Sequence, residues 1–112
     1  MADLNYKSIA KDMIAAMETV VKDHISDIRE LAEDELEDFA KRSVILTKKV
    51  RDGKLNQRQA EAILRIRRNA VETVLISIAG ISVVAAQDAI NAALGVLKGA
   101  IGSLIPGISI IE

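Results

Sequence analysis

Residues 74–97 read VLISIAGISVVAAQDAINAALGVL, and this stretch decides which folds the chain can adopt. Its only charged side chain is Asp88. Ile, Val, Leu and Ala occupy every side of a helix drawn through it, so no polar face remains for water. A helix of this kind must be surrounded by protein or by lipid.

Residues 14–50 carry apolar side chains at helical spacing. The steps along the series are all three or four residues and average 3.6, the period of an amphipathic α-helix. No glycine or proline interrupts residues 4–51, so we predict one charged, amphipathic helix there. The series comprises Ile14, Met17, Val21, Ile25, Ile28, Ala32, Leu36, Phe39, Ser43, Leu46 and Val50.

A basic turn is predicted at residues 52–56. Gly53 can adopt the left-handed conformation that ends a helix, and Asn56 with Gln59 has the spacing of a capping box. No proline follows until Pro106, which predicts a second, apolar helix over 57–104 and an apolar tail over 105–112. Glycines such as Gly80 weaken that helix by up to about 1 kcal/mol each, which a packed neighbour could offset.

The predicted fold is all-α, with residues 1–112 forming a single long antiparallel two-helix hairpin. The first helix has one apolar face and can cover only one side of the second, which excludes a soluble monomer. We therefore expect a homo-oligomeric helical bundle, ring or filament. Small residues that recur at every fourth position suit close helix contact. The predicted oligomer interface comprises Ser82, Ala85, Ala86, Ala89, Ala93, Gly95 and Gly99.

Asp88 is the one acid of the apolar stretch, and its neighbours depend on the register of the hairpin. If the two helices pair about the turn, Asp88 lies beside Lys22 and within a turn of His24. We expect a buried or half-buried contact of Asp88 with Lys22 or His24 that fixes the register of the assembly. Two alternatives stay open: a ring of Asp88 carboxylates lining a cation-selective pore, and simple exposure to solvent.

Charge is strongly segregated, although the formal net charge is only −1. Residues 1–40 hold eleven acids and four bases, whereas residues 41–68 hold ten bases and two acids. The hairpin would gather these bases at its closed end, where they suit an anionic membrane, nucleic acid bound without sequence preference, or the acidic run of a neighbouring copy. The predicted anion-binding residues are Lys48, Lys49, Arg51, Lys54, Arg58, Arg65, Arg67 and Arg68.

The chain contains no recognisable catalytic or cofactor motif. It has no Gly-rich phosphate loop, no nucleophile elbow and no paired-His motif, and its cysteine count is zero. His24 has no second His or Cys to complete a metal site. We therefore expect no enzyme activity, cofactor, bound metal or small-molecule substrate.

Residues 51–97, RDGKLNQRQAEAILRIRRNAVETVLISIAGISVVAAQDAINAALGVL, and the later PGISII resemble small helical proteins encoded among phage virion genes. The resemblance implies a multi-copy component of the virion or its ejection apparatus, located in the virion or the host cytoplasm. It identifies no site residues.

The residues themselves leave different functions open. The first is a non-enzymatic structural protein that self-associates through its apolar second helix. The alternative is a membrane-inserted oligomer such as a pore, a holin-like protein or a toxin, anchored by residues 73–104 with its basic turn on the cytoplasmic side. A protein that condenses nucleic acid is a third hypothesis.

Overall fold

In the computed structural model, four α-helices follow one another among the described residues: α1 (Tyr6–Met17), α2 (Ile25–Arg51), α3 (Gln57–Ala79) and α4 (Val83–Leu104). The structure describes residues 5–22, 25–105, 107–108 and 110–111, without the side chains of residues 25, 27, 31, 78 and 79. The regular structure of these residues is helical, so the prediction of an all-α fold is confirmed.

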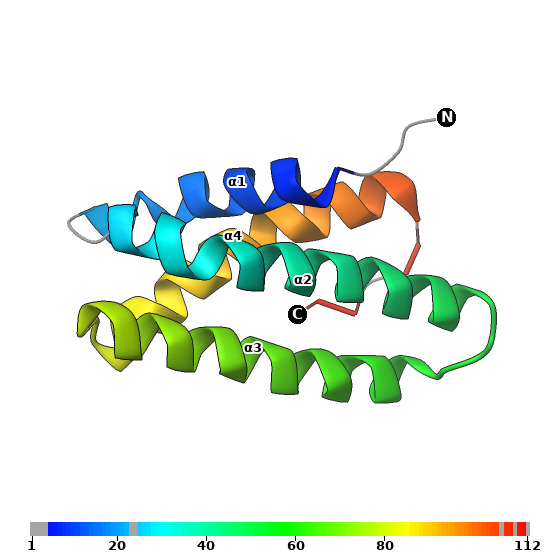
Figure 1. The fold of residues 1–112 in the computed structure, drawn as a ribbon. Coiled ribbons are helices and arrows are strands. Elements are labelled where there is room, and N and C mark those ends of the chain that lie inside the picture. Colours follow the sequence, from blue (N-terminus) through cyan, green and yellow to red (C-terminus); the bar gives the residue numbers. More distant parts are fainter. Residues whose placement is uncertain (1–4, 23–24, 106, 109, 112) are drawn as a thin grey trace.

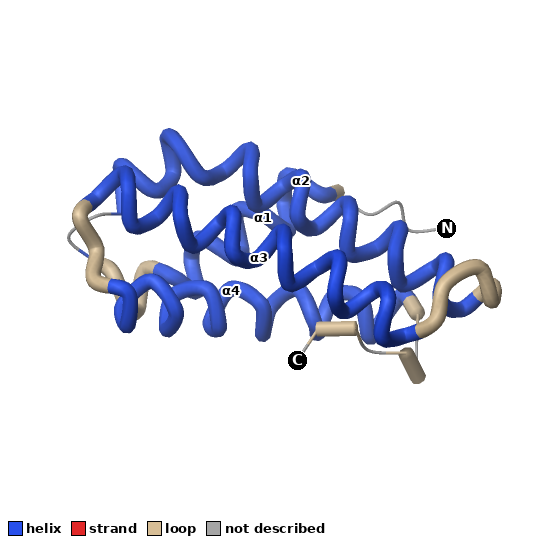
Figure 2. Tube along the Cα trace, turned by 90° about the horizontal axis from the view of Figure 1, so that it is seen from below, coloured by secondary structure: helices blue, strands red, loops and turns tan. Residues whose placement is uncertain are grey.

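Successive helices run in opposite directions and form an up-down-up-down four-helix bundle (Figure 1). α1 packs against both α2 and α4, and α2 packs against α3, whereas α3 and α4 contact each other more sparsely. The bundle is elongated, with extents of 42 × 29 × 18 Å. The helix connections therefore lie at its two ends, as Figure 2 shows from below.

The connection between α2 and α3 agrees with the sequence prediction. Gly53 adopts φ = 76°, and its neighbour Lys54 donates a backbone hydrogen bond of 2.9 Å to the carbonyl of Lys49. Asn56 caps α3, because its side chain accepts from the Gln59 N–H at 2.8 Å while the Gln59 side chain accepts from the Asn56 N–H at 3.0 Å.

The predicted single helix over 4–51 is wrong, because α1 ends at Met17 and α2 begins at Ile25. Thr19, Val20 and Val21 are three consecutive β-branched residues, which lose side-chain freedom inside a helix. The Thr19 hydroxyl donates to the Ala16 carbonyl at 2.8 Å, and the Val21 side chain is buried in the core. Weak helix propensity and the burial of Val21 together favour the break.

The predicted single helix over 57–104 is also wrong, because residues 80–82 separate α3 from α4. Gly80 ends α3 in the left-handed conformation, with φ = 60°. Ser82 then caps α4 by accepting a hydrogen bond of 3.1 Å from the Ala85 N–H. Gly80 is therefore the end of a helix and not a weak point within one.

These two breaks replace the two-helix hairpin with a bundle that has its own core. Within one chain, α1 and α2 now cover a large part of the apolar sequence that follows residue 70. The buried residues of α3, α4 and their connection include Val71, Leu75, Ile81, Ala86, Ala89, Ile90, Ala93, Leu94, Leu97 and Ile101. The premise that a single chain cannot shield this segment therefore has to be corrected.

The C-terminal tail completes the core on the side where α3 and α4 are apart. Gly107 adopts φ = 85° and turns the chain back towards the bundle (Figure 1). Ile110 and Ile111 are then buried beside Leu64 of α3 and Leu94 of α4. The tail thus supplies apolar contacts that α3 and α4 do not make directly with each other.

Candidate interaction surfaces

The predicted oligomer interface is divided between the inside and the outside of the bundle. Ala86, Ala89 and Ala93 are buried in the core of their own chain, and Ala85 is half-buried. Their small side chains suit the close packing of α4 within the bundle, so the contact they make is intramolecular. Ser82 is exposed and serves as the N-cap of α4.

Gly95 and Gly99 face solvent on α4, as does Gly102 in the next turn. Beyond its chain neighbours and the adjacent backbone of α4, a Cβ placed on any of the three would meet no atom within 4 Å, so packing inside the chain does not require glycine there. Each glycine destabilises a helix by about 1 kcal/mol relative to alanine. These residues leave a strip of bare backbone on the outer side of α4.

Several large apolar side chains also remain exposed. Ile66 on α3 is 70% exposed, and Val83 and Val84 at the start of α4 are 53% and 68% exposed. Exposed positions on α3 beside Ile66 include Ile63 and Ala70. The bundle therefore covers the inner sides of α3 and α4 but leaves apolar residues on their outer sides.

The predicted register contact of Asp88 with Lys22 is not formed among the described residues. Asp88 lies exposed on α4 and makes no ion pair or hydrogen bond within the described part of the chain. Lys22 is exposed in the connection after α1, and His24 lies outside the described residues. The predicted register assumed unbroken helices, and the breaks after Met17 and Ala79 remove that pairing. Within a single chain, solvent exposure is the alternative that the structure supports.

The eight predicted anion-binding residues separate into a group of five, a pair, and the single residue Arg65. Five of them surround the α2–α3 turn and are exposed, and we call this group the basic end: Lys48, Lys49, Arg51, Lys54 and Arg58. Arg51 donates to the Asp52 carboxylate at 3.0 Å. This hydrogen bond, and the positive charges of Arg51, Lys54 and Lys48, hold the pKa of Asp52 below its ordinary value of 3.8.

Arg67 and Arg68 instead connect helices of the bundle. Arg67 donates to Asp38 of α2 at 3.1 Å, and Arg68 donates to Asn91 of α4 at 2.6 Å. Both residues are half-buried and already bonded within the chain, and their role as surface anion ligands stays a prediction. Arg65 is exposed and lines the cavity beside the tail.

The acidic residues occupy the other half of α2. Glu30, Asp34 and Glu35 are exposed, whereas Glu37 and Asp38 are half-buried. Since α2 runs along the length of the bundle from the α1–α2 connection to the basic end (Figure 1), the two charge types lie at different positions along the long axis. The segregation seen in the sequence is therefore preserved in space.

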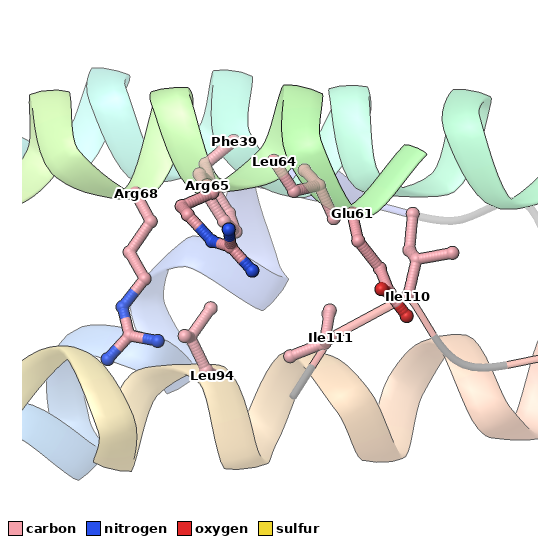
Figure 3. Close-up of a pocket in the computed structure, with 8 residues that line it drawn as sticks. All are labelled: Phe39, Glu61, Leu64, Arg65, Arg68, Leu94, Ile110 and Ile111. Atoms are coloured by element: carbon pink, nitrogen blue, oxygen red, sulfur yellow. The ribbon is translucent and has the colours of Figure 1, made fainter. Parts of the chain in front are cut away.

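A small cavity lies where the tail meets α3 and α4 (Figure 3). It is lined by Phe39, Glu61, Leu64, Arg65, Arg68, Leu94, Ile110 and Ile111. Its volume of about 40 Å³ has room for about one water molecule, far below the roughly 300 Å³ at which ligand pockets begin. We interpret it as a packing gap beside the tail.

Metal-binding clusters and membrane-spanning helices are both absent from the described part of the chain. No group of three or more His, Cys, Asp or Glu side chains among the described residues is placed to hold a metal ion. None of the four helices, as far as their residues are described, combines the length and the hydropathy needed to cross a bilayer.

Comparison with protein-family models, with curated proteins and with solved structures gives no match to this chain.

Proposed function

We propose that this protein is a non-enzymatic structural protein whose four-helix bundles assemble in several copies through the outer sides of α3 and α4. The observation that supports this proposal best is the exposure of Ile66, Val83 and Val84 on these two helices. Fully burying a Val or Ile side chain contributes roughly 1.5–3 kcal/mol. Burying the exposed parts of these three side chains in an assembly would therefore contribute a few kcal/mol per copy.

The bare strip of α4 adds a steric reason. Gly95, Gly99 and Gly102 let a neighbouring helix approach the α4 backbone closely, and packing within the chain does not explain why glycine stands there. Close backbone contact would recover the stability that the three glycines cost the isolated helix. A multi-copy assembly of this kind fits the virion or ejection component that the resemblance implies.

The oligomer mass tests the proposal directly. We expect sedimentation equilibrium in detergent-free buffer to give a discrete mass larger than that of the 12.1 kDa chain. Changing Ile66 and Val84 to Lys should shift the mass to that of one chain, because it places charge on the proposed contact. The control Ala15→Lys adds a charge on the exposed side of α1 and should leave the mass unchanged.

Two outcomes would contradict the proposal. A single-chain mass at every accessible concentration would remove self-association. Recovery of the protein from membranes only with detergent would favour the membrane-inserted alternative instead.

A further inference from the structure

The outward side of α2 includes a straight line of six positions, five of which carry charged side chains. The steps between successive members are four, three, four, four and three residues, so the line runs almost straight along the helix. Four of its charged members are exposed, and Glu37 and Ile45 are half-buried. We call this line the α2 stripe, and it consists of Glu30, Asp34, Glu37, Lys41, Ile45 and Lys48.

The order of charges along the α2 stripe gives the isolated bundle little net stabilisation, because repulsion among its acids offsets the favourable i,i+4 spacing of Glu37 and Lys41. Glu30 and Asp34 are four residues apart and Asp34 and Glu37 are three apart, so each pair repels. The helix dipole explains charges only within the first and last turns, which leaves acids in the middle of α2 without that benefit. Within the described residues, none of the stripe's charged side chains forms an ion pair.

The same order is complementary to itself when reversed. If two α2 helices lie antiparallel with their midpoints near Phe39, Glu30 of one faces Lys48 of the other, and Glu37 faces Lys41. The two-fold axis produces each pair twice, and Asp34 then lies nearly opposite Ile45, within a turn of Lys41 and Lys48. A parallel arrangement would place acids against acids and bases against bases, so charge selects the antiparallel orientation.

We infer that the α2 stripe is a contact surface for a second copy of this chain, bound antiparallel about a two-fold axis near Phe39. This inference rests on the proposed self-association and adds a second, electrostatic contact on the face of the bundle formed by α2. Because exposed ion pairs are weak and are screened by ions, the contact should weaken strongly as salt rises towards about 1 M, where the Debye length is about 3 Å.

Charge reversal followed by mixing tests the inference. One variant changes Glu30, Asp34 and Glu37 to Lys, and the other changes Lys41 and Lys48 to Glu, so each stripe carries a single sign. At low salt we expect the dimer Kd of each variant alone to rise by roughly tenfold or more. A 1:1 mixture should regain association, because a basic stripe then meets an acidic one. Circular dichroism checks that both variants keep their helix content.

A matched control changes Lys7 and Lys11 to Glu, which reverses two basic charges, as the Lys41 and Lys48 variant does, at exposed positions on α1 outside the stripe. It should associate as the wild type does. Association that is unchanged in both stripe variants but lost when Ile66 and Val84 become Lys would overturn this inference and leave the proposed function standing. A single-chain mass for the wild type at every concentration would remove the proposed function itself.

Disulfide trapping tests the orientation, since the chain contains no cysteine of its own. Glu30→Cys mixed with Lys48→Cys should form a mixed disulfide faster than either variant forms a disulfide with itself. In the antiparallel pair, the two copies of residue 30 lie roughly 27 Å apart, because 18 residues of helix separate residue 30 from the position that it faces. Faster formation of a disulfide between two copies of the Glu30→Cys variant would indicate parallel pairing and contradict the inference.

The competing occupant of the basic half of the stripe is a polyanion. We expect the wild type to associate with itself more strongly than it binds a fluorescent single-stranded oligonucleotide or phosphatidylserine vesicles. The reason is that the acidic half of the stripe repels phosphate. Two results together would overturn the inference in favour of the polyanion. The wild type would bind one of these probes but not itself at low salt, and changing Lys41 and Lys48 to Glu would abolish that binding.

Discussion

Two connections of the bundle use the same chemistry in opposite surroundings. Between α2 and α3, the left-handed Gly53 is followed by the N-cap Asn56, and between α3 and α4, the left-handed Gly80 is followed by the N-cap Ser82. The first connection lies among charged side chains, whereas Ile81, Val83 and Val84 surround the second. A helix end is therefore as well defined in an apolar stretch as in a polar one, but it is much harder to recognise.

The two connections should differ most in the unfolding free energy that is lost when the apolar side chain of each is truncated. Ile81 is buried between α3 and α4, whereas Leu55 in the polar turn is only half-buried. We expect Ile81→Ala to cost about 2–4 kcal/mol of unfolding free energy and Leu55→Ala about half as much, because less apolar contact is lost. Urea denaturation of both variants measures the difference, and equal losses would show that Ile81 does not anchor its connection.

Replacing the two left-handed glycines should affect both connections alike. Gly53→Ala and Gly80→Ala each place a Cβ in open space, so the cost is the backbone strain of about 1–2 kcal/mol. Small-angle scattering provides the sharper measurement. A longer maximum dimension for Gly80→Ala alone would mean that α3 and α4 have joined into one helix, and that the apolar connection depends on this residue far more than the polar one does.

Removing the two N-cap side chains should lower the unfolding free energy by slightly different amounts. Asn56→Ala and Ser82→Ala each remove a side-chain acceptor and should cost about 1 kcal/mol. Asn56→Ala should be the more harmful, because the reciprocal bond from Gln59 supports Asn56 and no such bond is present at Ser82 in the described residues. Thermal unfolding of the two variants checks the order, and a larger loss for Ser82→Ala would contradict it.

The smallest expected effect is the contribution of Asp52 to the pH dependence of stability. Since the pKa of Asp52 is below its ordinary value of 3.8 in the folded state, its interaction with Arg51 stabilises the fold above that value. This contribution is lost as pH falls through the lower, folded pKa. Asp52→Asn should therefore be slightly less stable than the wild type at neutral pH and equal to it in strong acid. Denaturation series from neutral to acidic pH measure this, and a difference that persists in acid would show that Asp52 acts by another means.

For the candidate surfaces, the sequence predicted the position of the charged groups well. It did not predict which residues the charged side chains contact. The basic end lies where the turn prediction put it, because Gly53 and Asn56 specify that turn locally. Arg67 and Arg68 were assigned to the same surface, but Asp38 and Asn91 hold them between helices. Their partners are 29 and 23 residues away, and no local pattern indicates which distant residues the folded chain brings together.

The all-α class, the α2–α3 turn and the buried side of α2 could be predicted from local sequence, because caps, glycine conformation and helical periodicity act over a few residues. Local sequence did not predict that the charged segment and the apolar segment each fold back on themselves, or that Ala86, Ala89 and Ala93 pack within their own chain. Breaking a helix sacrifices a few hydrogen bonds locally, and whether the burial of residues such as Val21, Ile81 and Ile111 offsets that loss depends on contacts that form only when the whole bundle closes.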